Sequence, residues 1–308
     1  MNFNDVETAR QKYHQKTKKA WSITAAILLG LAAIILVPQL IRGFSLHSLA
    51  SIFPLFFVFV ISIIVIQFAT RKEAEAYRKA YKAYFVEQNL KSIFTNVNYD
   101  HNAGLDPNIL RATSMINTGD RYHSNDLTTA RYKDVLFTQA DAHIEEEHTD
   151  SDGDTTYVTI FRGRFMIFEF PKKFNFKLEL VGRHFHAYRV PGKNPTTGRK
   201  MTKINTESDE FNKTFKILGE DGFEAYYLLD PAIMVKIQDI AAHYKNSLLL
   251  GFIDNKLLIA LNDGKDSFEP PKASQPIDKQ AETQKVNEGI KVITDFVDNL
   301  NLDRKLFK

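Results

Sequence analysis

The sequence predicts an α+β fold in which a two-span transmembrane helical hairpin precedes a cytosolic antiparallel β-sheet, or partial barrel, with packed helices. Two apolar runs, at 21–41 and 49–69, are each long enough to cross a bilayer as a helix. The rest of the chain carries strand-like runs joined by hairpin turns, with few helices between them. That order favours an antiparallel sheet with helices packed on it over a doubly wound nucleotide-binding fold.

The two apolar runs predict an anchor rather than a transport pathway. Arg42 is the single charged residue between Trp21 and Ala69, and it lies in the short external loop expected at 42–48. Transport pathways usually contain ionisable side chains at membrane depth. Such groups are energetically costly there and are retained only where the function requires them. Since neither run contains one, we expect two anchoring helices. A homo-oligomeric channel or transport component stays an alternative, because two spans cannot enclose a pore alone.

Basic residues on both flanks predict the orientation. Residues 1–20 and 70–91 each carry a net charge of +3, whereas residues 92–308 carry −4. Because Lys and Arg close to a span stay in the cytoplasm, we expect a multi-pass protein of the cell (inner) membrane with both termini cytoplasmic. The lipid bilayer is then one partner. The acidic balance of the domain argues against nucleic acid as another, since nucleic-acid binders present a basic face.

Helix signals also occur outside the membrane. The segment 70–98 predicts a connector helix, which either packs its tyrosine stripe on the domain or a second copy, or lies on anionic headgroups. Two Asp-Pro pairs supply an N-cap followed by proline at the first helical position, which predicts helices over 108–116 and from Asp230 to about Tyr244. An apolar stripe predicts a last amphipathic helix over about 279–302.

The strands are expected mainly as hairpins. The turn sequence at 150–154 separates two long runs, and Gly163 in the second predicts a bulge or a close backbone approach. The complete set of predicted strands is 134–148, 155–170, 174–181, 214–218, 223–228, 247–253 and 256–261. The chain therefore divides into a cytosolic segment 1–20, spans 21–41 and 49–69 around the loop 42–48, the connector 70–98, an α+β domain 99–270, and a proline-rich linker with the C-terminal helix at 271–308.

Candidate chemistry is sparse. The chain has no cysteine, which excludes disulfides, thiolate metal sites and a cysteine nucleophile. His143, Glu145, Glu147 and His148 are weak candidates for metal ligands, because imidazole and carboxylate groups hold divalent ions. On a strand, however, His148 points to the opposite face from the other three. We expect a polar hairpin tip there, and we identify no catalytic residue and no cofactor-binding residue; no cofactor is expected.

The segment Ser208–Pro270 resembles a bacterial family of membrane proteins, domain of unknown function 3137. The most specific elements are FN-x-x-F at Phe211–Phe215, L-x-P at Leu229–Pro231 and FEP at Phe268–Pro270, and the likeness extends over most of residues 70–300. The resemblance implies the same plan, a two-span hairpin ahead of a cytosolic domain, in a bacterial inner membrane. It implies no activity and no functional residue.

These observations favour a membrane-tethered binding or scaffold module whose cytosolic domain recognises a protein, a peptide or a lipid headgroup. A protein partner or a second copy of the chain is therefore expected beside the bilayer. An enzyme is the less favoured reading. It would act close to the membrane. It would use either the cluster from His143 to Asp154, in which His143, Glu145, Glu147 and His148 could hold a metal ion, or the pair His184 and His186.

Overall fold

The computed structural model describes residues 1–42, 53–174, 176–220, 226 and 228–302. Most of the external loop predicted at 42–48 lies outside these residues, as do positions 49–52 of the second predicted span. The chain forms two compact units. Unit 1 contains residues 1–86 and 269–282, and unit 2 contains residues 87–268 and 283–308.

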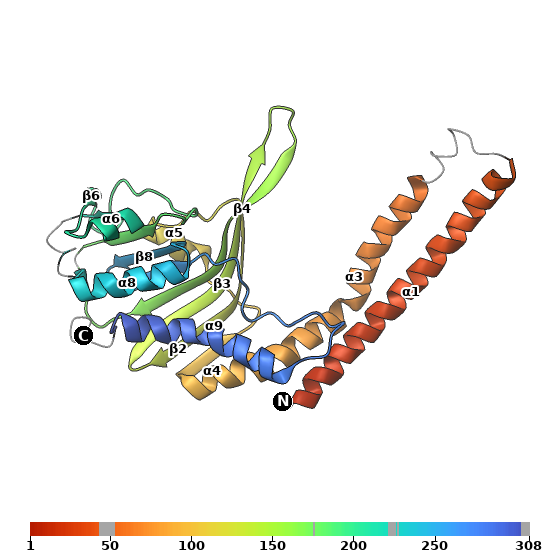
Figure 1. The fold of residues 1–308 in the computed structure, drawn as a ribbon, viewed down its shortest axis with the longest axis horizontal. Helices are drawn as coiled ribbons and strands as arrows, with labels where there is room; N and C mark the ends of the chain where they lie inside the picture. Colours follow the sequence, from red (N-terminus) through yellow and green to blue (C-terminus); the bar gives the residue numbers. More distant parts are fainter. Residues whose placement is uncertain (43–52, 175, 221–225, 227, 303–308) are drawn as a thin grey trace. The chain divides into compact units, whose positions relative to one another are not determined.

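Unit 1 is built on two long helices, α1 (Phe3–Arg42) and α3 (Phe53–Tyr81), which run side by side in Figure 1. Trp21 meets Phe59, Tyr13 stacks on Tyr77, and Lys16 forms an ion pair with Glu73 at 2.7 Å. The helical path continues after α3 as the π-helix η1 (Lys82–Glu87). Aromatic contacts and an ion pair therefore join the two helices.

Both helices of unit 1 are long and apolar enough to cross a membrane. A helix of similar composition in a soluble core would be buried, but only 6% and 11% of their most apolar windows are buried here. Side chains such as Leu29 and Ile34, each 71% exposed, face outward from the pair. Exposed apolar surface on this scale marks a membrane or protein contact, so the prediction of a membrane-associated protein is confirmed at this level.

The segment 269–282 is bound to these helices within unit 1. Lys82 donates to Glu269 at 2.7 Å, Tyr77 donates to the carbonyl of Pro271 at 3.1 Å, and Arg10 donates to the carbonyl of Ala273 at 2.5 Å. Burial, supported by the carboxylates of Glu282 and Glu7, outweighs the opposing Arg10 cation and raises the pKa of Tyr77 well above its ordinary value. The proline-rich stretch is thus an ordered strap, held by side chains from α1, from the end of α3 and from η1.

Unit 2 is built on one open antiparallel sheet of nine strands in the order β1-β2-β3-β4-β9-β8-β5-β7-β6. The strands are β1 (Thr95–Asp100), β2 (Arg121–Tyr132), β3 (Val135–Thr149), β4 (Thr155–Glu169), β5 (Leu178–Gly182), β6 (Thr202–Ile204), β7 (Phe215–Gly219), β8 (Leu248–Ile253) and β9 (Lys256–Leu261). Among the described residues, the helices are α4 (Gln88–Ile93), α5 (Pro107–Thr113), α6 (Asp209–Thr214), α8 (Pro231–His243) and α9 (Lys279–Asn299), of which α9 begins in unit 1. The α+β prediction is confirmed, and the sheet is not closed into a barrel.

Alternation along the central strands gives the sheet two different faces. Ala140 and Ala142 of β3 and Phe165 of β4 belong to an apolar core that also contains Leu110 of α5. The residues between them, Asp141 and Arg164, are paired across β3 and β4 and therefore lie on the opposite face. Helices α8 and α9 cover that second face (Figure 1).

Capping and turn signals correctly located several elements. The Asp106 side chain accepts a hydrogen bond from the backbone N–H of Asn108, and Asp230 accepts one from Ile233, so both N-caps are confirmed. The hairpin across 150–154 and the pair β8–β9 are also confirmed. A Cβ atom added at Gly163 would lie 2.0 Å from the carbonyl oxygen of Leu261, which confirms the close backbone approach.

Other boundaries differ from the expectation. The helical path ends at Ile93, whereas the connector was expected to reach residue 98, and β1 begins at Thr95 instead. The strand expected over 174–181 is shorter and later, since β5 starts at Leu178. Strands β1, β2 and β6 were not predicted, because their residues are largely polar and lack clear alternation. Most of the predicted strand 223–228 lies outside the described residues.

Candidate ligand cavity and carboxylate cluster

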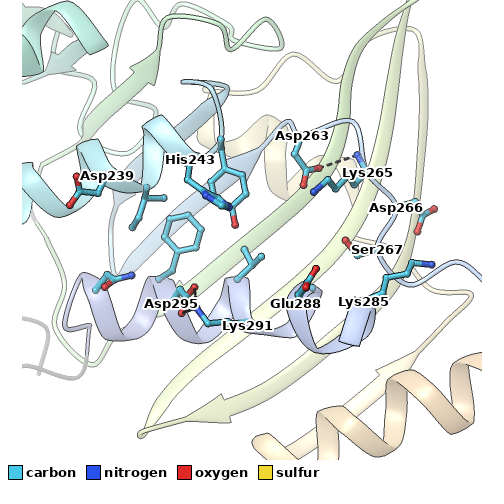
Figure 2. Close-up of a pocket in the computed structure, with 16 residues that line it drawn as sticks. Asp239, His243, Asp263, Lys265, Asp266, Ser267, Lys285, Glu288, Lys291 and Asp295 are labelled. Carbon is cyan, nitrogen blue, oxygen red and sulfur yellow. Dashed lines mark hydrogen bonds and ion pairs between the residues drawn. The ribbon is translucent and has the colours of Figure 1, made fainter. Parts of the chain in front are cut away.

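A cavity of about 900 Å³ lies between α8 and α9 in unit 2 (Figure 2). Its walls are the end of α8, the segment 263–267 that follows β9, and the middle of α9. The apolar part comes from side chains such as Ile240, Val292 and Phe296. This volume falls within the range of small-molecule sites, which spans about 300–1,000 Å³.

Charged groups surround the cavity, and acidic groups outnumber basic ones. The lining carboxylates are Asp239, Asp263, Asp266, Glu288 and Asp295, and the lining ammonium groups are Lys265, Lys285 and Lys291. Lys291 is paired with Asp295 one helical turn away at 2.6 Å. Burial raises the pKa of Asp263 and, with the nearby carboxylates, raises that of Tyr244 to about 12. A ligand that carries positive charge is therefore favoured in this cavity.

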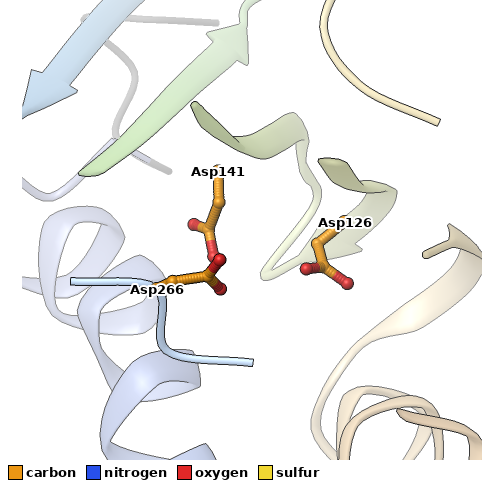
Figure 3. Close-up of side chains that lie close together, drawn as sticks. All are labelled: Asp126, Asp141 and Asp266. Atoms are coloured by element: carbon orange, nitrogen blue, oxygen red, sulfur yellow. The ribbon is translucent and has the colours of Figure 1, made fainter. Parts of the chain in front are cut away.

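A buried carboxylate cluster adjoins the cavity at Asp266. One oxygen from each of Asp126, Asp141 and Asp266 lies within 4.8 Å of the others, and Figure 3 shows the three carboxylates converging. Asp126 is 0% exposed and Asp141 is 3% exposed, so two of the three are removed from water. Within the described part of the chain, this is the group of acidic or histidine side chains close enough to share an ion.

Each aspartate comes from a different element. Asp126 lies where the β2–β3 register shifts, and its φ of 59° is a left-handed conformation that aspartate tolerates better than most residues. Its carboxylate accepts hydrogen bonds from Tyr99 and from Asn125. Asp141 lies in the interior of β3, and Asp266 lies in the segment between β9 and α9. The bulge in β2 thus brings the Asp126 carboxylate beside that of Asp141, which strand alternation already directs to the same face.

One arginine supports the cluster. Arg164 donates from Nε to Oδ1 of Asp141 at 2.9 Å and from Nη1 to the carbonyl of Gly289 in α9 at 2.5 Å. Its guanidinium carbon also lies 4.7 Å from the centre of the Phe268 ring. Burial disfavours the charged guanidinium, but the Asp141 carboxylate outweighs it and holds the pKa of Arg164 above its ordinary value. Arg164 therefore joins the sheet to α9 as a permanent cation.

The metal-ligand candidates from the sequence lie elsewhere, on the outer part of β3. Nε2 of His143 lies 2.9 Å from the Thr159 hydroxyl and 4.0 Å from Oε1 of Glu145. Glu147 accepts a hydrogen bond from Tyr157 at 2.7 Å, and His148 is exposed at the end of the strand. Among the described residues, these four do not form a group of three side chains that could share one ion.

Asp126, Asp141 and Asp266 were missed by sequence reasoning, although one signal was present. Asp141 lies in the middle of a strand, and its neighbours along the chain are small and buried. An aspartate without a partner is rarely found in the interior of such a strand. A partner had to be sought on an adjacent strand. Asp126 and Asp266 gave no comparable signal, because both stand in polar surroundings that read as turns.

Comparison with known proteins supports the resemblance stated above. The model of the family DUF3137, described as protein of unknown function, matches residues 159–302. A search of curated proteins finds no match. A crystal structure of the mycobacterial trehalose monomycolate transport factor A, TtfA, aligns with a TM-score of 0.39 and 10% identity, covering 72% of this chain and 93% of that one. Residues 159–302, which include β4, α8, β8, β9 and α9, are thus identified as a DUF3137 segment.

Proposed function

We propose that this protein is a membrane-anchored binding module whose sheet domain lies in the cytoplasm and binds a small, positively charged or zwitterionic ligand between α8 and α9. The cavity carries the proposal, because it combines a small-molecule volume with an excess of carboxylates over ammonium groups. Anchoring rests on α1 and α3, whose apolar side chains are exposed. The basic flanks of the two spans support the cytoplasmic orientation.

Blocking the cavity is expected to remove the ligand. Val292 lines the cavity, so Val292→Trp places an indole in it, whereas Val235→Trp adds the same bulk on an exposed position of α8 that does not line it. Full-length protein purified from membranes in mild detergent would be examined by native mass spectrometry. We expect a bound small molecule on the wild-type chain and on Val235→Trp, and its loss from Val292→Trp. A wild-type chain without bound mass, or an unchanged bound mass on Val292→Trp, contradicts the proposal.

The orientation can be tested with single cysteines, because the natural chain has none. Ser48→Cys lies in the predicted external loop, and Ser151→Cys lies at the exposed turn between β3 and β4. A membrane-impermeant maleimide added to intact cells is expected to label Ser48→Cys alone, and to label both variants after permeabilisation. Labelling of Ser151→Cys in intact cells would show that the domain is outside the cytoplasm.

A further inference from the structure

We propose that two copies of this chain associate through the outer part of β4, residues 155–159, which we call the free edge of β4. The two free edges lie antiparallel about a two-fold axis at Tyr157 and join the sheets of both copies. This inference goes beyond the proposed function, because none of these residues lines the cavity between α8 and α9.

Along this stretch β4 has a neighbouring strand on one side only. β3 pairs with β4 from Thr155 onward, whereas β9 pairs with β4 only over Arg164–Glu169. Within the described residues, no backbone group outside β3 pairs with that of residues 155–159. Figure 1 shows this hairpin extending beyond the rest of the sheet. One side of the hairpin is therefore open to a further strand.

The direction of the backbone groups of β4 follows from those of β3. The Glu147 N–H donates to the Asp120 side chain at 2.8 Å, and the Asp120 N–H donates to the Glu145 carbonyl at 2.9 Å. Both glutamates thus turn these groups away from β4. In an antiparallel pair, two residues directly opposite each other either exchange both hydrogen bonds or both point away. Tyr157 lies opposite Glu147 and Thr159 lies opposite Glu145, so their N–H and C=O groups point out of the hairpin.

The free edge has a defined length. Thr155 lies two residues before Tyr157 on β4, so its backbone groups point outward by the same alternation. At the other end, the side chain of Asn262 accepts from the N–H of Arg162 at 2.9 Å and donates to the carbonyl of Ile160 at 3.2 Å. The chain itself therefore covers the outward groups that follow the free edge and leaves those of the free edge uncovered.

The side chains of the free edge are suited to strand pairing. All five are β-branched or aromatic, namely Thr155, Thr156, Tyr157, Val158 and Thr159. Residues of these types are enriched in strands. Exposed edges are usually protected by charged side chains or proline, and the free edge contains neither. Val158 is 47% exposed. The edge can therefore accept a further strand, as in recognition by β-strand addition.

A second copy of the same edge fits these constraints. With Tyr157 opposite Tyr157 of the second copy, Thr155 of each copy lies opposite Thr159 of the other, and each pair exchanges two N–H···O bonds. Every outward backbone group of the free edge then has a partner. Between these pairs, Thr156 lies opposite Val158 of the second copy, where two β-branched side chains pack on the pleated surface.

Charge favours the antiparallel arrangement of the two copies. The turn at one end of the free edge carries Asp150, Asp152 and Asp154, whereas the exposed Arg162 lies beyond the other end. Two-fold pairing places the acidic turn of each copy at the Arg162 end of the other. A parallel arrangement brings the two acidic turns together, and like charges on neighbouring strands are destabilising. The free edge is therefore complementary to itself in charge as well as in hydrogen bonding.

Cysteine cross-linking tests the position of the axis, because the natural chain has no cysteine. At a hydrogen-bonded antiparallel pair the Cα atoms are about 5.5 Å apart, which a disulfide can span. In membranes from expressing cells treated with copper phenanthroline, Tyr157→Cys is expected to give a disulfide-linked dimer that a thiol reductant cleaves. Ser151→Cys, on the exposed turn of the same hairpin, should not be cross-linked, because the two copies of residue 151 are roughly 40 Å apart in this arrangement.

A second pair of variants tests the backbone hydrogen bonds. Tyr157→Pro removes the central N–H, which faces out of the hairpin, so the single chain tolerates the change and the pairing does not. Tyr157→Phe keeps this N–H and is the control. By native mass spectrometry of the full-length protein in mild detergent, we expect twice the mass of one chain for the wild type and for Tyr157→Phe. For Tyr157→Pro we expect the mass of one chain.

Four results would overturn the proposal. Three come from cross-linking: Tyr157→Cys forms no dimer with itself in membranes, it is linked to a different protein instead, or Ser151→Cys is cross-linked as strongly. The fourth is a Tyr157→Pro chain that keeps the mass of a dimer, because the copies would then associate through another surface.

Discussion

Replacing Arg164 by Met is expected to destabilise unit 2 by about 3–5 kcal/mol, because it leaves a buried carboxylate without its cation. Arg164 and Asp141 are each 5% exposed in their side chains and are joined at 2.9 Å. The same change removes the hydrogen bond to the Gly289 carbonyl and the contact with the Phe268 ring. For a domain of this size, such a loss lowers Tm by roughly 10 °C. Thermal unfolding of the full-length protein, followed by circular dichroism, would measure it.

Arg162 provides the matched control. It lies two residues earlier on β4 and is exposed, so Arg162→Met removes the same charge from the same strand without uncovering a buried partner. We expect it to change stability by less than about 1 kcal/mol. The double variant Arg164→Met with Asp141→Leu should be less destabilised than the two single variants added together, because the pair is removed as a unit. Equal Tm values for Arg164→Met and Arg162→Met would refute the role given to this ion pair.

Local signals predicted the parts of the fold that local chemistry decides. Asp106-Pro107 and Asp230-Pro231 both cap helices, because an Asp side chain satisfies a free N–H and proline lacks one. The turn sequence at 150–154 is likewise a local signal, and it fixes the position of the long β3–β4 hairpin. These local signals could not predict the order of the strands in the sheet. Strand β4 pairs with β9, and β8 pairs with β5, through contacts far apart in sequence that no turn specifies.

The candidate site depends on these long-range contacts. Asp126 joins the cluster because the β2–β3 register shifts between Asn125 and Thr128. The polar sequence of β2 does not predict this shift. Asp266 reaches the cluster because β9 pairs with β4, which brings the following segment over Arg164. His143 and His148 attracted attention because they are chemically conspicuous, yet they lie on the outer hairpin. Proximity in space, rather than density along the chain, defined the cluster.

Replacing Lys82 by Met is expected to release the segment 269–282 from α3 and η1 within unit 1. The Lys82 side chain is 1% exposed, and its Nζ lies 2.7 Å from Oε1 of Glu269. Burial alone would raise the pKa of Glu269, but the hydrogen bonds and charges of Lys82 and Arg78 outweigh it and hold that pKa below its ordinary value. Loss of a buried partner costs about 3 kcal/mol. Hydrogen–deuterium exchange in 269–282 should therefore become roughly a hundredfold faster at pH 7.

The pH dependence and a second variant distinguish this ion pair from general packing. A carboxyl group whose pKa is lowered by folding stabilises the protein above its unfolded pKa, about 4.5, and loses that effect as the pH falls through the folded pKa. The difference between Lys82→Met and the wild type should therefore narrow below about pH 4.5, after correction for intrinsic exchange rates. Arg78 contacts the same carboxylate at 3.2 Å, but its side chain is 53% exposed, so Arg78→Met should cost less than about 1 kcal/mol. An equal effect of both variants, or one independent of pH, would show that Lys82 acts through packing and that the charge of Glu269 does not hold the strap.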